Sequence, residues 1–151
     1  MYVALGFVTT LPAFAQAVDG RIIGDPHAPG AQRPMVLDAG NGVPQVNITT
    51  PSAAGVSRNR YSQFDVGSQG VILNNSRTGA TTQLSGPITG NPNLARGTAR
   101  IILNEVNGPA SQLNGYVEVG GDRAQVVVAN PAGIRANGGG FINASRVTLT
   151  T

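Results

Sequence analysis

The sequence predicts an all-β protein, and three observations lead to that prediction. Turn-forming residues are abundant, with 21 glycines and 10 prolines among 151 residues. Apolar residues make up 40% of the chain, which is too many for a disordered linker. Short apolar segments, some of them alternating with polar residues, recur between the turns. At this length, a single domain of many short strands joined by tight turns fits the pattern.

Strand-like segments follow one another through most of the chain. Alternation of apolar and polar residues predicts strands with one buried and one wet face, at 45–49, 116–119 and 146–150. Continuous apolar runs predict strands covered on both sides, at 71–73 and 126–128. Turns rich in glycine and asparagine separate the segments, at 40–42, 107–109, 120–122 and 137–140. Only residues 95–106 have some helical potential, and Gly97 with Ile101-Ile102 still favours a strand there.

The spacing of the segments narrows the choice of architecture. From Leu84 onward they recur every eight to twelve residues, which suits a sandwich, a barrel or a coil of short strands. Asparagine-rich turns and small or β-branched apolar residues favour a parallel β-helix, because stacked coils place like residues above one another. The chain also ends at Thr151 within a strand-like segment, and in a β-helix this would leave an open sheet edge. We therefore expect the chain to be the first piece of a longer protein.

The first seventeen residues predict an export signal. Residues 3–12 form an uncharged, mostly apolar run, and residues 13–17 supply the small-x-small pattern that signal peptidase reads. The run is too short for stable membrane insertion, because a span takes about 20 apolar residues. Since no basic residue precedes the run, we interpret 1–17 as the remnant of a truncated signal and 18–151 as the domain. A buried N-terminal strand or helix is the alternative.

Charge and residue types disfavour several functions. All ten basic residues are arginines, scattered without a run, and the net charge is only +3, which disfavours nucleic-acid binding. The chain has no cysteine, which excludes disulfides and thiolate chemistry. His27 is the only histidine, and the acids are too dispersed to form a local acid-base pair or a calcium loop. We predict no catalytic residue, no metal site and no cofactor.

Two asparagine-proline turns, which we call the two signatures, are more specific motifs than the other turns of the chain. They are Asn91-Pro92-Asn93-Leu94 and Asn130-Pro131-Ala132-Gly133-Ile134. In such a corner the asparagine side chain accepts a hydrogen bond from a backbone N–H two residues on, and proline presets φ at the next position. Each is therefore expected to be a rigid turn beside a strand.

These corners and the segments around them resemble the N-terminal secretion domain of two-partner secretion exoproteins. That family includes filamentous haemagglutinins, large haemolysins and contact-dependent growth-inhibition effectors of Gram-negative bacteria. The resemblance runs from about Val36 to the end, with further matching segments at 43–48, 55–66, 70–75, 140–143 and 149–151. Ala132 stands where an asparagine or aromatic is common in the family. Ala136 and Gly139 stand where growth-inhibition effectors often carry a cysteine pair, so this turn holds without a disulfide.

The resemblance implies a right-handed parallel β-helix with an N-terminal cap and extra-helical β-strands. It also implies a monomer that is exported to the periplasm and recognised there by the POTRA modules of an outer-membrane transporter. That recognition would start translocation of the exoprotein to the cell surface or extracellular space. The two signatures would either contact the transporter or hold the fold, with Leu94 and Ile134 packing inward.

Two functions of other classes stay open. A surface adhesin that binds glycans or host-cell receptors would need exposed aromatic residues, and the candidates are Tyr61, Tyr116 and Phe141. A β-helical polysaccharide-cleaving enzyme would need clustered acids on one face, and the sequence shows no such cluster.

Overall fold

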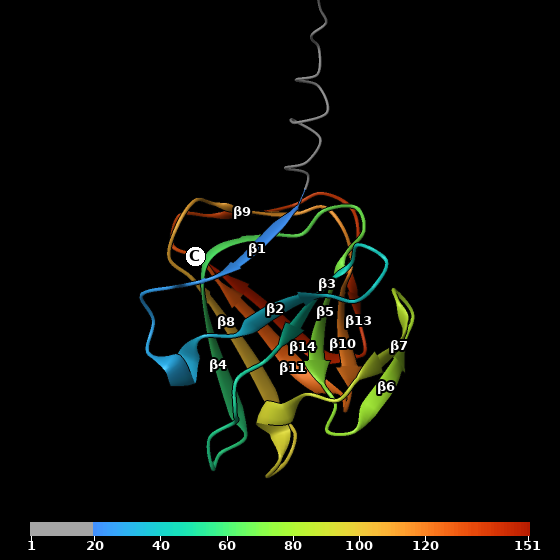
Figure 1. Cartoon of the computed structure of the whole chain (residues 1–151). Helices are drawn as coiled ribbons and strands as arrows, with labels where there is room; N and C mark the ends of the chain where they lie inside the picture. The colour runs from blue at the N-terminus through green and yellow to red at the C-terminus, as the bar shows by residue number, and fades with distance from the viewer. Residues whose placement is uncertain (1–19) are drawn as a thin grey trace, which may run out of the picture.

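Parallel strands stacked in successive coils make up most of residues 20–151, the part of the chain that the computed structural model describes (Figure 1). The first coil contains β3 (Pro44–Asn47) and β4 (Val56–Asp65), and the second contains β5 (Val71–Asn75), β8 (Ile101–Val106) and β9 (Ser111–Leu113). The third contains β10 (Val117–Gly121), β11 (Ala124–Ala129) and β12 (Ile134–Ala136), and the fourth contains β13 (Phe141–Ile142) and β14 (Ala144–Thr150). The export signal predicted at residues 1–17 lies outside the described range.

Three parallel ladders run along the axis of this coil. One joins β3, β5, β10 and β13, the second joins β4, β8, β11 and β14, and the third joins β9 and β12. We refer to the second ladder, with the β1 strand described next, as sheet A. The arrangement confirms the prediction of a parallel β-helix.

Two antiparallel strands cap the N-terminal end. Strand β1 (Arg21–Gly24) pairs with β4, and β2 (Met35–Asp38) pairs with β3, with the 3-10 turn η1 (Gly30–Gln32) between them. They cover the backbone edges of the first coil, which would otherwise be free to pair with another chain. This confirms the predicted N-terminal cap.

An extra-helical hairpin leaves the coil between β5 and β8. Its strands β6 (Gly79–Thr82) and β7 (Gly86–Thr89) are antiparallel and lie beside β10 (Figure 1). Ile88 of β7 packs on Val43 and Ile72, on the outer side of the ladder. Residues 71–73 are therefore buried on both faces, as predicted.

One sequence prediction about this sheet is wrong. Gln45, Asn47 and Glu118 were expected on wet faces, yet their exposed fractions are 4%, 5% and 4%. Alternation along a strand cannot reveal a cover formed by a distant segment. The reverse error occurs in β11, which was expected to be covered on both sides, whereas Val127 on its outer face is only half-buried.

The main core fills the space between the ladders. Tyr61 and Phe64 are fully buried and meet edge to face, with ring centroids 4.8 Å apart. Val126 and Val128 continue the inward rows above Ile102 and Asn104. Residues 95–106 form no helix, because the chain enters β8 after the single 3-10 turn η2 (Pro92–Leu94). Within residues 20–151, no helix is long and apolar enough to cross a membrane.

Candidate functional site

The first signature is the corner through which the chain re-enters the coil after the hairpin. The Asn91 amide donates to the carbonyl oxygens of Ile48 and Asn74, each at 3.0 Å. Its side-chain oxygen accepts the N–H of Asn93 at 2.9 Å, which is the expected asparagine turn. Since Ile48 follows a strand of the first coil and Asn74 belongs to the second, one buried side chain joins two coils.

The other residues of this corner are fixed by core packing and by hydrogen bonds to neighbouring segments. Leu94 is fully buried in the main core. Asn93 donates through its amide to Ile48 O at 3.1 Å and accepts at its carbonyl from the Thr50 hydroxyl at 2.9 Å. The Arg77 guanidinium donates to Leu94 O at 3.1 Å and to Ala95 O at 2.8 Å. Pro92 is exposed at the tip of the turn.

The second signature is the corner between β11 and β12. The Asn130 amide donates to Pro109 O at 2.9 Å and to the Ser111 hydroxyl at 3.0 Å, both in the second coil. Its side-chain oxygen accepts Ala132 N at 2.9 Å, and its own N–H donates to Thr150 O of the fourth coil at 3.0 Å. Asn130 is fully buried and therefore connects the coils on either side of its own.

The second corner is exposed to solvent on its outer side and packed against the core on its inner side. Pro131 and Ala132 are exposed, whereas Ile134 is half-buried and packs against the main core. Gly133 adopts a φ of 120°, which an L side chain rarely adopts, so glycine is required there.

The two corners do not form one site. The first precedes β8 and the second follows β11, so they lie at opposite ends of sheet A. A strand of about six residues spans roughly 20 Å. A single small ligand therefore cannot contact the exposed tips of both corners.

Sequence analysis missed other asparagines that make the same kind of contact. The Asn75 amide donates to Ala99 O at 2.9 Å and to Asp122 O at 2.8 Å, and its oxygen accepts Ala99 N. The Asn143 amide donates to Val119 O and Gly121 O, at a φ of 60°. Neither is followed by proline, so the only signal was their place at the end of a strand-like segment.

The prediction that Tyr61 is an exposed aromatic residue of an adhesin groove is wrong. Tyr61 is fully buried, and its hydroxyl donates to the Asn104 side-chain oxygen at 3.0 Å. Alternation in β4 directs this position into the core instead of toward solvent. Tyr116 is exposed and Phe141 is half-buried.

Comparison with known proteins identifies the family of this β-helix. The family model described as the TPS secretion domain matches residues 21–151. The chain belongs to this family. The TPS secretion domain is 57% identical over 152 residues to Toxin CdiA of Yersinia pestis, covering all of this chain and 4% of that protein. It is 54% identical to tRNA nuclease CdiA-2 of Burkholderia pseudomallei (strain 1026b), over 82% of this chain and 4% of that protein.

A solved structure agrees with the family assignment. The crystal structure of a filamentous hemagglutinin secretion domain matches with a TM-score of 0.77 and 41% identity, over 86% of this chain and 42% of that one. The TPS secretion domain thus shares the fold of that structure. Because it spans about 4% of the length of these CdiA relatives, the toxin and nuclease activities in their names describe those whole proteins.

Proposed function

We propose that this TPS secretion domain is the secretion-targeting module of a large exoprotein. An outer-membrane β-barrel transporter recognises it in the periplasm through POTRA modules and starts translocation to the cell surface or medium. The module acts as a monomer and performs no catalysis. The observation that carries this proposal is the match of residues 21–151 to a family of secretion domains.

Stacking of coils supplies a physical bias for outward transport. Each new coil buries an inward row on the previous one, such as Val126 on Ile102 and Val119 on Leu73. Burial of apolar surface contributes about 25 cal/mol per Å². If coils form only outside the cell, each one opposes backsliding of the chain, and no nucleotide hydrolysis is needed.

The two signatures act in this proposal by holding the coils together. Their asparagines are almost completely buried, and every polar atom of the two amides has a partner within the domain. A transporter could therefore touch only the outer parts of the corners, Pro92, Pro131 and Ala132. The transporter recognises the folded or folding module, and the asparagines contribute through stability.

Export measurements test both parts of the proposal. The chain, supplied with an intact export signal, is produced in Gram-negative cells with and without the transporter of its own secretion system. We expect the chain in the medium only when the transporter is present. Export that is independent of the transporter, or no export at all, would overturn the secretion function.

Substitutions in and outside the two signatures then test whether the signatures act in transporter recognition or in stability of the fold. Asn91→Ala removes the side-chain donor to Asn74 O and one of two side-chain donors to Ile48 O, and Asn130→Ala removes the donor to Pro109 O and to the Ser111 hydroxyl. Each also removes the acceptor of a turn N–H, so we expect losses of about 3 kcal/mol in unfolding free energy, together with reduced export. Asn137→Ala, at an exposed asparagine, and Ala132→Glu, at the outer tip, should retain both stability and export. A stable Asn91→Ala protein that is not exported would show instead that the signature is a recognition element.

A further inference from the structure

Arginine side chains in this domain are almost all without an acidic partner. Across residues 20–151, the only ion pair joins Arg58 Nε to Glu105 Oε1 at 2.6 Å. The other carboxylates accept hydrogen bonds from uncharged donors. These donors are His27 N to Asp25, Gly40 N and Gly42 N to Asp38, Gln63 Nε2 and Gln112 N to Asp65, Gln83 N and Leu84 N to Glu118, and the Thr98 hydroxyl to Asp122. The positive charge of the domain is therefore not neutralised internally.

Three of these arginines lie where the strands of sheet A begin, and a fourth, Arg96, lies in the loop that leads to β8. Arg100 immediately precedes β8, and Arg123 immediately precedes the neighbouring strand β11. Arg146, near the start of β14, is in register with Gln125 of β11. Strand spacing of about 4.8 Å places β8 and β14 only about 10 Å apart. We call Arg96, Arg100, Arg123 and Arg146 the arginine edge.

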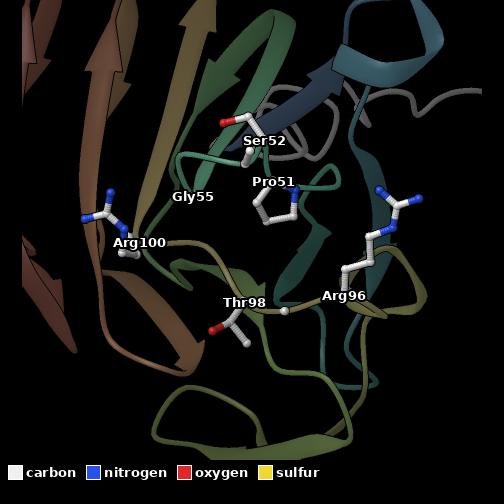
Figure 2. A pocket seen from close by; sticks show the side chains of 8 residues that line it. Pro51, Ser52, Gly55, Arg96, Thr98 and Arg100 are labelled. Carbon is white, nitrogen blue, oxygen red and sulfur yellow. The ribbon is translucent and has the colours of Figure 1, made fainter.

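A pocket opens at one end of the arginine edge. It has a volume of about 400 Å³, and its lining includes Pro51, Ser52, Thr98, Arg96 and Arg100. Figure 2 shows Arg96 and Arg100 on opposite sides of this pocket, with Pro51 between them. Arg100 donates to Ala54 O at 2.7 Å and is thereby anchored, while Arg96 is exposed and makes no side-chain bond within the described chain.

The edge carries a clear excess of positive charge. Among residues 20–151, Asp122 lies beside it, where it accepts the Thr98 hydroxyl at 2.7 Å. The starts of β8, β11 and β14 lie within about one to two Debye lengths of one another at physiological salt, so Arg100, Arg123 and Arg146 act together on an approaching partner. An arginine guanidinium also offers the paired donors that bind carboxylates in two-point contacts.

We propose that the arginine edge is the docking surface for an acidic face of the transporter's periplasmic modules, with an aspartate or glutamate side chain entering the pocket between Arg96 and Arg100. The inference rests on the proposed function, because it names the surface of the domain that the transporter would bind. A protein partner is favoured over an anionic membrane, because the pocket is lined by proline, small residues and arginines, with no large apolar side chain to act as a membrane anchor.

Matched charge removals test the proposal. The first variant, R96Q/R123Q, alters two exposed loop arginines of the edge, and the control, R21Q/R135Q, removes two exposed arginines elsewhere. All four side chains lack a hydrogen bond within the described chain, so both variants should fold as the unchanged chain does, which thermal unfolding would verify. Binding of each to the purified periplasmic modules is followed at 50 and 300 mM NaCl.

We expect R96Q/R123Q to associate about tenfold more slowly at low salt and with weaker salt dependence, while R21Q/R135Q stays within twofold of the unchanged chain. Equal slowing by both variants, or by neither, would overturn the arginine edge as docking surface and leave the proposed function standing. If the unchanged chain does not bind the modules, both proposals fail. Binding to phosphatidylglycerol vesicles that needs Arg96 and Arg123, without binding to the modules, would instead make the edge a membrane contact.

Discussion

Tyr61 shows how one buried polar side chain constrains the domain. Its ring packs on Phe64, and its hydroxyl donates to Asn104, whose amide in turn donates to Ile102 O and Val127 O. Each group is satisfied, so this polar network inside the core carries no unpaired atom. Burial raises the pKa of the Tyr61 phenol, because the phenolate would lose its hydration.

This raised pKa predicts a loss of stability at alkaline pH. The unfolded chain releases the phenol proton near pH 10, while the folded chain retains it, so the stability present below pH 10 declines as pH rises. The slope from one such group is about 1.4 kcal/mol per pH unit. Tyr61→Phe should cost about 1 kcal/mol at neutral pH and flatten the alkaline decline, as measured by chemical unfolding between pH 8 and 11.5.

Tyr116→Phe is the control for this experiment. Tyr116 is 47% exposed, so this substitution removes one phenol hydroxyl outside the core and is the matched comparison for Tyr61→Phe. An identical decline in Tyr61→Phe and in the unchanged chain would contradict the assignment to Tyr61.

At the scale of elements, one buried carboxylate binds the turn of the extra-helical hairpin to the coil. Glu118 of β10 accepts the N–H of Gln83 at 2.8 and 3.0 Å and the N–H of Leu84 at 2.9 Å. Both donors lie in the turn between β6 and β7, and the carboxylate is buried beneath it. Apolar contact between Ile88 and Ile72 adds to the attachment, as does the bond from the Asn74 amide to Thr89 O at 3.0 Å. At the turn, the Ser85 hydroxyl and the Asn41 amide form further bonds, to Ala39 O and Leu84 O.

Glu118→Gln should loosen this hairpin while the coils stay intact. The amide group can replace only part of the acceptor set, and its NH₂ faces an N–H donor, so we expect a loss of about 2 kcal/mol. Hydrogen exchange should accelerate in residues 79–89 and remain slow in β8 and β11. Exchange that accelerates equally in the hairpin and in β8 would show that the hairpin unfolds only with the whole domain.

For the whole molecule, burial changes along the axis of the coil. Val126 and Val147 occupy the same inward row in neighbouring coils. Val126 is fully buried between coils, whereas Val147 is 38% exposed in β14. In a stacked structure each coil derives stability from the coils beside it, and within residues 20–151 β14 pairs with β11 alone.

Two matched valine-to-alanine substitutions measure this difference in burial, which we call the gradient. Val126→Ala should cost about 2 kcal/mol of unfolding free energy, since it leaves a cavity between two coils. Val147→Ala removes the same atoms from a partly exposed site and should cost less than about 1 kcal/mol. Equal costs in urea unfolding would contradict the gradient.

The sequence by itself determined the architecture and the family of this protein. Turn residues at regular spacing, strands of small and β-branched residues and the two asparagine-proline corners are local features, so they could be recognised without coordinates. Local chemistry also predicted the asparagine turns, because the accepted N–H lies only two residues away.

Tertiary structure alone decided which polar residues are buried. The carbonyls bound by Asn91 and Asn130 lie 17 to 43 residues away in sequence, and the contact of Glu118 spans about 35. The arginine edge likewise draws on three segments that become neighbours only when coils stack. Alternation along a strand reports two faces, but what covers each face depends on contacts between distant segments.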